Sequence, residues 1–556
     1  MAEAAPNSRG NTPTIPTPKL LTDDHAPAIS SPLNPDAPPL SARPSKPLPR
    51  EQREKRESLK KRESTKGRGG TPDGSRGKGT HAAPGVPSPM RYSINEPKLS
   101  DFDTPRDVQF ASHEPIPFTY PSGEEELKRP LDLAENKRGF RYALCVADPL
   151  FRHKQYYRQT EVKPYGPCMS FNDSDKSIHF NEAGRIVTNE KGWRLSKANV
   201  CAREGTSYFE VKIIRGVPQD SSPIPVGGET TPQPHIRAGW ARREAPLDAP
   251  VGFDGYSYGI TDIRIDTIHR SRPGRIFHPS KSKSKTTTAK NSKSKTADLP
   301  QPSDAIREGD ILGLELTLPP LSLHRKVVTG MYNPAVDNFD PRSTGTLDPS
   351  HDIIRDRIPV AYKGHMYFEH MDYVSSKAME SYADRGPFNK ITPNPNHEDA
   401  PLRSLPQSSI RVYKNGRLLG TAFENLLAFL PPASQPSAAQ ARLGFDDAML
   451  GYFPAVAAFT GGTAEVNFGP EWWAPPERAE DGKDARVGEE ERNAEGSMIR
   501  GVGERFKEQI AEDILWDVVD EADFFVQDGG YAADEGKRGT TQGMAKRVAN
   551  LQEANE

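Results

Sequence analysis

Residues 209–213 read Phe-Glu-Val-Lys-Ile, and this alternation of apolar and charged side chains decides the fold class. Successive side chains of a β-strand point to opposite faces, so the run predicts a strand with one buried face. The same period of two recurs at 312–318, 410–413 and 464–468. No helical periodicity of any length separates these runs, and several short strands without intervening helices predict an all-β antiparallel sandwich.

Turn residues and long polar insertions separate the strands. Asn415-Gly416 follows the 410–413 run and predicts a hairpin turn of the primed type. Three segments, about 218–234, 272–303 and 375–407, are too long and too polar to be simple turns. Loops of this length inside a compact domain are usually functional or disordered, and we predict disorder for these insertions.

Outside the sandwich the composition changes at both ends. We predict a disordered, basic and proline-rich arm over 1–105, the sandwich over 130–477 and a charged linker over 478–500. A helix follows at 503–526, and a disordered tail at 527–556. The arm contains a charged run at 50–68, which reads either as a solvated tail or as a nuclear import signal with weak affinity for nucleic acid.

The overall composition supports this division. Only 34% of the 556 residues are hydrophobic, and 54 are proline, so part of the chain buries too little surface to offset its ordering entropy. Basic and acidic residues balance, 74 against 76. Three cysteines are too few for a disulfide framework or a cysteine-rich zinc module, and no stretch has the length of a membrane span. We expect a soluble intracellular protein without membrane contact.

The residues show no pattern of catalysis. The HExxH, GxSxG and Cys-x-x-Cys patterns are absent, and the thirteen histidines are scattered without metal-ligand spacing. Gly77-Lys78 resembles the end of a phosphate loop, but Gly79 stands where the magnesium-binding hydroxyl belongs. We therefore expect a protein that is not an enzyme and that holds no cofactor and no metal.

The segment after the linker has a helical period. Its apolar residues recur every three to four positions, while acidic residues occupy other faces, which predicts an amphipathic helix. The stripe consists of Phe506, Ile510, Ile514, Leu515, Val518 and Val519. Such a stripe beyond the main core needs a groove, either in a partner or on its own sandwich.

Three motifs in order resemble a known domain. Residues 235–240 read His-Ile-Arg-Ala-Gly-Trp, 249–254 read Ala-Pro-Val-Gly-Phe-Asp, and 256–259 read Tyr-Ser-Tyr-Gly. They resemble the SPRY (B30.2-like) domain of the trithorax-group "absent, small or homeotic discs" family, in its short fungal form. The later segments 366–369, 413–416 and 467–470 agree in order. The family belongs to COMPASS (Set1C) complexes, which methylate histone H3 on lysine 4.

The resemblance implies a nuclear, non-catalytic scaffold. In the family, a basic pocket lined by aromatic rings holds an acidic segment of the WD-repeat subunit, and the two together activate the SET-domain methyltransferase. The final helix docks onto a Dumpy-thirty-like helical dimer, and here 513–518 match it. Because the zinc finger and winged helix of animal relatives are missing, any contact with nucleosomal DNA is expected to be weak and to come from basic loops.

The resemblance also places the pocket residues. Arg237 and Pro250 match the family's arginine and proline, while Phe253 and Trp193 stand where the family has tyrosine. A second family arginine falls at the offset of threonine 261, and Arg264 is its nearest substitute. Guanidinium groups suit carboxylates, and aromatic walls strengthen the attraction.

Each of these assignments has a structural alternative. Arg237 reads equally as one partner of an internal salt bridge, Pro250 and Phe253 as loop packing, and Trp193 as core. At the level of the whole protein, the alternative is a SPRY adaptor of another complex, such as a ubiquitin-ligase substrate receptor or a Ran-binding-type scaffold. A lectin or an enzyme on a jelly-roll-like sandwich is a third class, for which the sequence shows no paired acids or calcium ligands on one face.

Overall fold

The protein was analysed as a computed structural model that describes most of the chain between residues 97 and 526. The described residues are 97–111, 118–119, 126–131, 133, 139–149, 156–218, 233–276, 305–337, 353–355, 357–362, 364–384, 386, 389–437, 445–477 and 500–526. The predicted arm up to residue 96, the linker up to residue 499 and the tail 527–556 lie outside this set.

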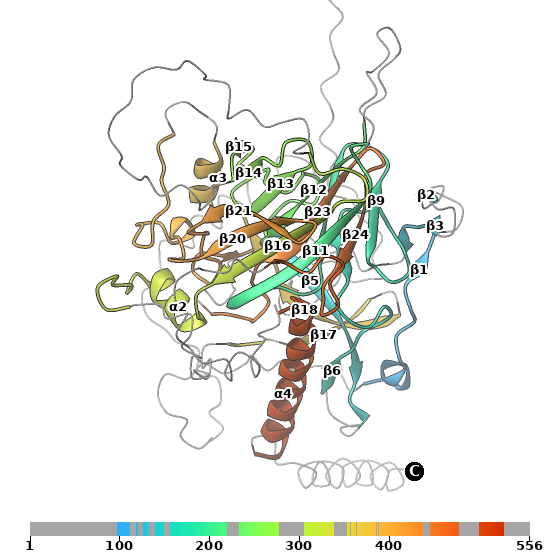
Figure 1. The fold of residues 1–556 in the computed structure, drawn as a ribbon. Helices are drawn as coiled ribbons and strands as arrows, with labels where there is room; N and C mark the ends of the chain where they lie inside the picture. Colours follow the sequence, from blue (N-terminus) through green and yellow to red (C-terminus); the bar gives the residue numbers. More distant parts are fainter. Residues whose placement is uncertain are drawn as a thin grey trace, which may run out of the picture.

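Two antiparallel sheets of seven strands form the body of the molecule (Figure 1). The first has the order β21-β20-β16-β11-β24-β9-β8. Its strands are β8 (Ile178–Phe180), β9 (Ile186–Asn189), β11 (Gly205–Arg215), β16 (Ile311–Leu318), β20 (Ser409–Lys414), β21 (Arg417–Glu424) and β24 (Thr463–Asn467). The second has the order β15-β14-β13-β12-β23-β10-β7. Its strands are β7 (Met169–Ser174), β10 (Trp193–Ala198), β12 (His235–Ala241), β13 (Ser257–Thr261), β14 (Thr267–His269), β15 (Arg272–Gly274) and β23 (Phe453–Phe459).

The main core lies between these two sheets. Phe209 on β11 and Trp240 on β12 are fully buried and meet edge to face, with ring centroids 4.9 Å apart. Rings prefer this geometry, and each large aromatic side chain removes much apolar surface from water. The four alternating runs of the sequence fall on β11, β16, β20 and β24. The all-β antiparallel sandwich is therefore confirmed.

The hairpin between β20 and β21 also has the predicted turn. Asn415 and Gly416 have φ angles of 49° and 82°, so both central residues are left-handed, as a type I′ turn requires. Asn415 further fixes the turn, because its side-chain amide donates a hydrogen bond to Asp310.

A smaller sheet of four strands has the order β17-β18-β5-β6. Its strands are β5 (Phe140–Ala147), β6 (Tyr157–Gln159), β17 (Ile358–Tyr362) and β18 (His365–Met371). It has its own apolar clusters, one with Phe140 and Tyr367 and the other with Cys145 and Phe368. Three two-stranded pairs complete the strands: β1 (Gln109–Phe110) with β4 (Pro130–Leu131), β2 (Phe118–Thr119) with β3 (Glu126–Leu127), and β19 (Tyr373–Val374) with β22 (Gln435–Pro436).

The prediction that no helix lies between the strands is wrong. Among the described residues, two short helices do: α2 (Leu321–Thr329) and α3 (Lys377–Ala383), besides the 3₁₀ turn η4 (Ala400–Leu402). A further 3₁₀ turn, η1 (Leu99–Phe102), precedes the first strand. With nine and seven residues, α2 and α3 are too short for a periodic pattern to stand out.

The segment 375–407 also differs from the expected disordered insertion. Ser376 caps α3 by accepting a hydrogen bond from the Met379 amide, and Met379 and Leu402 are buried. A few large apolar side chains thus attach a polar segment to the body. The insertion at 272–303 begins with strand β15, and its described part ends at residue 276. Of the insertion at 218–234, only residues 218, 233 and 234 are described.

The predicted C-terminal helix is present as α4 (Glu504–Val526), which projects from the body in Figure 1. Among the described residues, no helix combines the length and the apolar character needed to cross a membrane.

Candidate partner-binding site

Arg237 lies on β12 with its side chain on the outer face of the second sheet. Its neighbours Ile236 and Ala238 point into the core and are almost completely buried, whereas Arg237 is only half-buried. This is the alternation that the sequence predicted for residues 236–240.

The Arg237 guanidinium lies over the ring of Trp193, 4.5 Å from its centre. The two residues are on β12 and β10, with β23 between them. Ala457 of β23 stands directly opposite Arg237, and its small side chain leaves the arginine room to lie across the strand. A cation over an indole face is attracted by the ring quadrupole, which contributes about 0.5–2 kcal/mol. The predicted pocket arginine and its aromatic wall therefore lie together.

Two further rings, which were not among the predicted site residues, extend this wall. Phe459 packs against Trp193 with ring centroids 5.1 Å apart, and His235 packs against Phe459 at 6.1 Å. The strand register explains the grouping, because Phe459 of β23 is paired with Trp193 on one side and with His235 on the other. The sequence hints at this grouping through the alternation over residues 453–459, which places the last residue, Phe459, on the outer face of the strand.

Arg237 has no carboxylate partner among the described residues. Burial lowers the pKa of its guanidinium, and the attraction of Asp262 opposes this. The Asp262 carboxylate is itself engaged, since it accepts hydrogen bonds from the Ile236 amide and from His235 Nδ1. Within the described part of the chain, the alternative of an internal salt bridge at Arg237 is therefore not realised. A half-buried guanidinium on an aromatic wall is suited to an external carboxylate.

Pro250 and Phe253 lie on the loop between β12 and β13. The loop turns at Gly252, and the Phe253 amide donates to the Pro250 carbonyl. Pro250 is half-buried, while Phe253 keeps 46% of its surface exposed. Loop packing therefore accounts for Pro250 better than for Phe253, whose ring is available to a partner.

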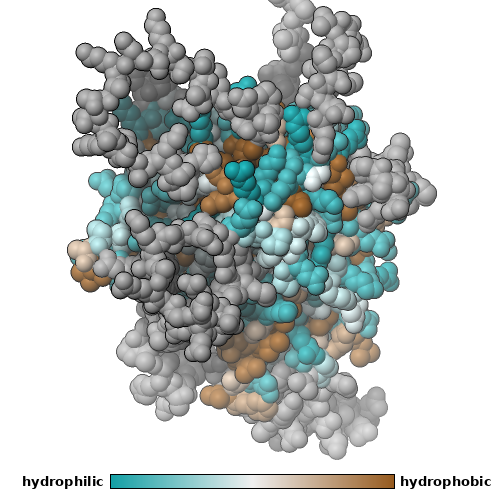
Figure 2. All heavy atoms as spheres, in the orientation of Figure 1, coloured by the Kyte–Doolittle hydropathy of each residue, from teal (hydrophilic) through white to brown (hydrophobic). Residues whose placement is uncertain are grey.

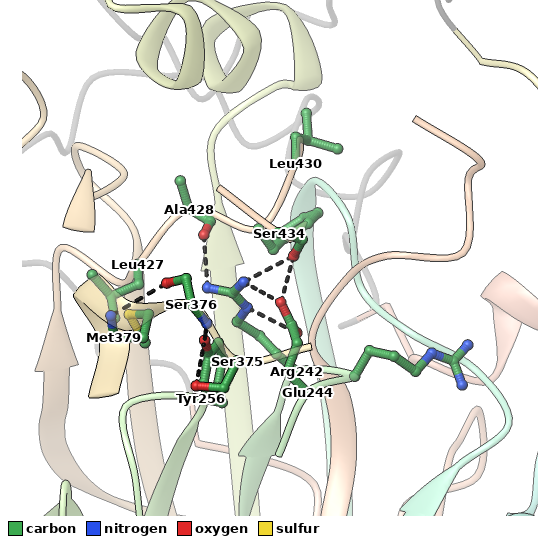
Figure 3. A network of polar contacts seen from close by, with 12 residues as sticks. Arg242, Glu244, Tyr256, Ser375, Ser376, Met379, Leu427, Ala428, Leu430 and Ser434 are labelled. Carbon is green, nitrogen blue, oxygen red and sulfur yellow. Dashed lines mark hydrogen bonds and ion pairs between the residues drawn. The ribbon is translucent and has the colours of Figure 1, made fainter. Parts of the chain in front are cut away.

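A buried polar network fixes the start of this loop (Figure 3). The Arg242 guanidinium is completely buried, forms an ion pair with Glu244 and donates to the Ala428 carbonyl and to the Ser434 hydroxyl. It also lies 4.9 Å from the centre of the Tyr256 ring, near the end of the loop. Because both charges are paired and hydrogen-bonded, the network holds the loop in one arrangement.

Arg264 is not brought to Arg237. Threonine 261 pairs directly with Arg237 across β12 and β13, so the family's second arginine would have stood beside the first. Arg264 is exposed in the turn after β13, and no contact with Arg237 is found in the described residues. That Arg264 takes the place of the family's second pocket arginine stays a prediction.

Helix α4 presents its apolar stripe to solvent. Phe506, at its start, is buried against the main core, but the following turns are not. The exposed fractions are 40% for Ile510, 56% for Ile514, 60% for Leu515 and 52% for Val518, and Val519 is half-buried. Figure 2 shows apolar surface gathered where α4 lies. The packed side of α4 is instead acidic.

Two arginines of the body hold that acidic side. Arg355 forms ion pairs with Glu512, at 3.1 Å, and with Asp513, and Arg357 binds Asp517 at 2.6 Å. Both arginines lie just before β17, in a stretch that reads as an ordinary charged loop. The sequence alternative that α4 packs on its own sandwich therefore holds for Phe506 and the acidic face, while the apolar stripe is left without a partner in the described residues.

A search among curated proteins found close relatives. The COMPASS component cclA of Colletotrichum higginsianum (strain IMI 349063) is 42% identical over 559 residues, which cover 95% of this chain and 92% of that protein. The chain belongs to the cclA family of COMPASS components. The cclA protein of Aspergillus fumigatus is 40% identical over 79% of this chain and 67% of that protein.

The cclA-family chain is also similar to proteins with other names. The Set1 complex component ash2 of Schizosaccharomyces pombe is 33% identical over 78% of this chain and 52% of its own length. The Set1/Ash2 histone methyltransferase complex subunit ASH2 of Drosophila melanogaster is 24% identical over 70% of this chain and 51% of that protein. Each of these names describes a component or subunit of a complex.

Comparisons of this cclA-family protein with protein-family models and with solved structures add no further evidence on its family. No protein-family model matches the chain. The solved structure of a human SPRY domain aligns with a TM-score of 0.21 and 13% identity, over 53% of this chain and 98% of that one. The strand pairings define the sandwich, and this alignment carries no argument for it. Among the described residues, no group of three or more metal-ligating side chains is found.

Proposed function

We propose that this cclA-family protein is a non-catalytic scaffold subunit of a COMPASS-type complex that methylates histone H3 on lysine 4 in the nucleus. The relatives are named as components of COMPASS, of the Set1 complex and of a histone methyltransferase complex. The described surfaces fit a protein that holds partners, since they offer a cationic aromatic site and an unpaired apolar helix face.

The Arg237 site binds an acidic segment of the complex's WD-repeat subunit. The observation that carries this proposal is the Arg237 guanidinium, which lies on Trp193 and has no carboxylate partner in the part of the chain that the structure describes. A guanidinium offers two parallel N–H groups to a carboxylate, and the ring beneath it keeps water from one face. By holding the WD-repeat subunit in this way, the protein helps to keep the SET-domain enzyme in its active arrangement.

Helix α4 supplies the second docking surface, for a Dumpy-thirty-like helical dimer. Its acidic face is bound to Arg355 and Arg357, so the stripe of Ile510, Ile514 and Val518 points away from the body. An amphipathic helix that exposes its apolar face matches helix-in-groove recognition. A weak contact with nucleosomal DNA stays a prediction, because the basic stretches 50–68 and 281–295 lie outside the described residues.

Calorimetric titration of the full chain with an acidic peptide of the WD-repeat subunit tests the first site. The variant Arg237→Glu should weaken binding by about 2–5 kcal/mol, the range for a desolvated charge pair. The matched control is Arg417→Glu, which reverses one exposed charge on β21 in the other sheet. Equal affinity of Arg237→Glu and the control would count against the site, provided that both variants keep the unfolding temperature of the parent.

Pull-down with the helical dimer tests the second surface. The variant Ile514→Asp places a carboxylate in the middle of the stripe and should abolish co-purification, whereas Ile514→Leu keeps the apolar surface and should preserve it. Retention of the dimer by Ile514→Asp would show that the stripe is not the docking face.

A further inference from the structure

A cavity of about 610 Å³ lies between two sheets, away from the Arg237–Trp193 pair. One wall is β7, the edge strand of the second large sheet, and the opposite wall is formed by β5 and by the segment that follows β6. We call it the edge cavity. The side chains that line it and are used below are Arg141, Tyr142, Phe171, Asp173, Arg243 and Tyr367. Its volume is in the range of ligand-binding pockets.

Two arginines share one carboxylate in this cavity. Arg141 binds Asp173 at 2.8 Å, and Arg243 binds the same carboxylate oxygen. The half-buried Asp372 carboxylate also attracts Arg141. The cavity lining as a whole carries four basic residues, Arg106, Arg141, Lys163 and Arg243, against three acidic ones, Asp107, Glu161 and Asp173. Burial raises the pKa of Glu161 to about 7, so the described lining keeps a small excess of positive charge. In a partly buried setting such a charge favours an anion strongly.

Both arginines also keep N–H groups without a partner. Arg141 Nη1 and Arg243 Nε are buried and have no hydrogen-bond acceptor among the described residues. Arg243 is itself more than nine-tenths buried, with its guanidinium 4.6 Å from the centre of the Phe453 ring. An unpaired buried N–H of a charged group destabilises the protein, and an incoming carboxylate would remove that cost by accepting its hydrogen bond.

The β7 wall adds a backbone template. β7 pairs with β10 on one side only, and residues 170–173 fall where that pairing is interrupted between Met169 and Ser174. These four residues line the cavity. The Asp173 amide already donates to the Ser170 hydroxyl, and the Ser170 carbonyl accepts from the Ser174 hydroxyl, so the main-chain groups offered to a ligand are those of Phe171 and Asn172. An edge strand offers main-chain N–H and C=O groups to an added extended segment, while side-chain pockets select its sequence.

Aromatic rings form part of the remaining walls. Tyr142 and Tyr367 meet edge to face at 6.3 Å, and on the opposite side Phe171 packs against Phe180 at 5.0 Å. Apolar walls around a few convergent polar groups are the usual composition of a binding pocket. They fit a ligand in which apolar side chains alternate with a carboxylate.

We propose that the edge cavity binds an acidic peptide in extended conformation, which lies along β7 and places a carboxylate against Arg141 and Arg243. The edge cavity is separate from the Arg237 site. Its arginines, Arg141 and Arg243, lie on β5 and in the loop after β12, and the strand along which the peptide would lie is β7. The inference does not depend on the proposed function of the Arg237 site.

The experiment uses the full chain carrying Arg237→Glu, so that the first site is disabled. The probe is a short peptide in which valine alternates with glutamate, labelled with a fluorophore and a photo-crosslinker, and the comparison peptide has glutamine in place of glutamate. Binding is followed by anisotropy, and the crosslinked residues are located by mass spectrometry.

Two variants shift the charge of the cavity in opposite directions. Arg141→Gln leaves the balanced pair of Arg243 and Asp173 and should weaken binding about tenfold, the effect of losing one charge-assisted contact. Asp173→Asn releases both arginines and should strengthen binding. The matched control, Arg158→Gln, removes a positive charge on β6 that does not line the cavity, and should bind like the parent.

The expected result is preference for the glutamate peptide, opposite shifts in the two variants and crosslinks to residues 159–163 or 170–173. The proposal is overturned by equal binding of the glutamine peptide, by unchanged affinity in both variants, by crosslinks confined to other segments, or by inorganic phosphate that binds as tightly as the peptide. The two variants are expected to change the affinity for the peptide in opposite directions. Loss of folding in one variant can only weaken binding, so it does not reproduce the expected pair of results.

Discussion

Arg355, whose side chain is only 8% exposed, binds Glu512 and Asp513 on the first half of α4. Burial raises the pKa of Asp513, and the Arg355 charge works against that shift. The helix is therefore attached to the body through its charged side. This reverses the usual arrangement, in which the apolar face of a helix packs inward.

Replacing Arg355 by glutamine should loosen α4 without unfolding the sandwich. The loss of a charge-assisted contact to two carboxylates should cost about 1–3 kcal/mol of local stability. Backbone amide exchange should accelerate over residues 504–517 and stay unchanged in β11 and β16. The control is Arg500→Gln, whose partners Glu504 and Glu508 are exposed. Unchanged exchange along α4 would show that Phe506 alone anchors the helix.

The pair Arg242 and Glu244 should behave as a coupled unit. Arg242→Met leaves the Glu244 carboxylate buried without its cation and should destabilise the protein by about 3–5 kcal/mol. The double variant Arg242→Met/Glu244→Leu removes both charges and should recover much of this loss. Urea unfolding of the parent, of the single variants Arg242→Met and Glu244→Leu, and of the double variant measures the coupling, and simple additivity of the two single changes would contradict a direct interaction.

His324 should make the protein sensitive to acid. Its Nε2 accepts hydrogen bonds from the Phe429 and Leu430 amides, so this nitrogen carries no proton, and burial holds the pKa well below 6.5. The unfolded chain binds a proton near pH 6.5 and the folded chain does not, so stability should fall as the pH drops below that value. The slope from this group approaches about 1.4 kcal/mol per pH unit.

The variant His324→Gln tests this assignment. Its amide oxygen can accept from the same two backbone groups but does not titrate. The expected result is a shallower loss of stability between pH 6.5 and pH 4.5, measured by urea unfolding at several pH values. A slope equal to that of the parent would show that other groups dominate acid unfolding.

The sandwich was predictable because its strands carry their own signal. The alternation at 209–213 and 312–318 identifies a buried face locally, and Asn415-Gly416 specifies its turn without reference to distant residues. The outward direction of Arg237 follows from the same period. Its contact with Trp193 does not, because it depends on β23 lying between β10 and β12 and on Ala457 being small.

The remaining features depend on contacts between distant segments. Helix α3 has no recognisable pattern in the sequence, because its buried residues are Met379 and Tyr382, and two apolar residues in a polar segment do not show a helical period. The roles of Arg355 and Arg357 were missed for a similar reason. Nothing near them in the sequence indicates that the acidic face of a helix more than 150 residues later lies against them.

Gly252 should be irreplaceable in the loop that carries Pro250 and Phe253. Its φ is +80°, and a Cβ atom there would lie 2.3 Å from the Ile268 carbonyl oxygen. The matched control is Gly364, with a φ of +82° and no atom within 4 Å of the added carbon. Both alanine variants incur the left-handed strain, about 1 kcal/mol, but only Gly252→Ala also meets backbone. Gly252→Ala should therefore lower the unfolding temperature more than Gly364→Ala does. It should also weaken binding of the acidic peptide, because the loop must move away from β14. Equal effects of the two variants on stability and on peptide affinity would mean that the loop adjusts freely and that its arrangement does not contribute to peptide binding.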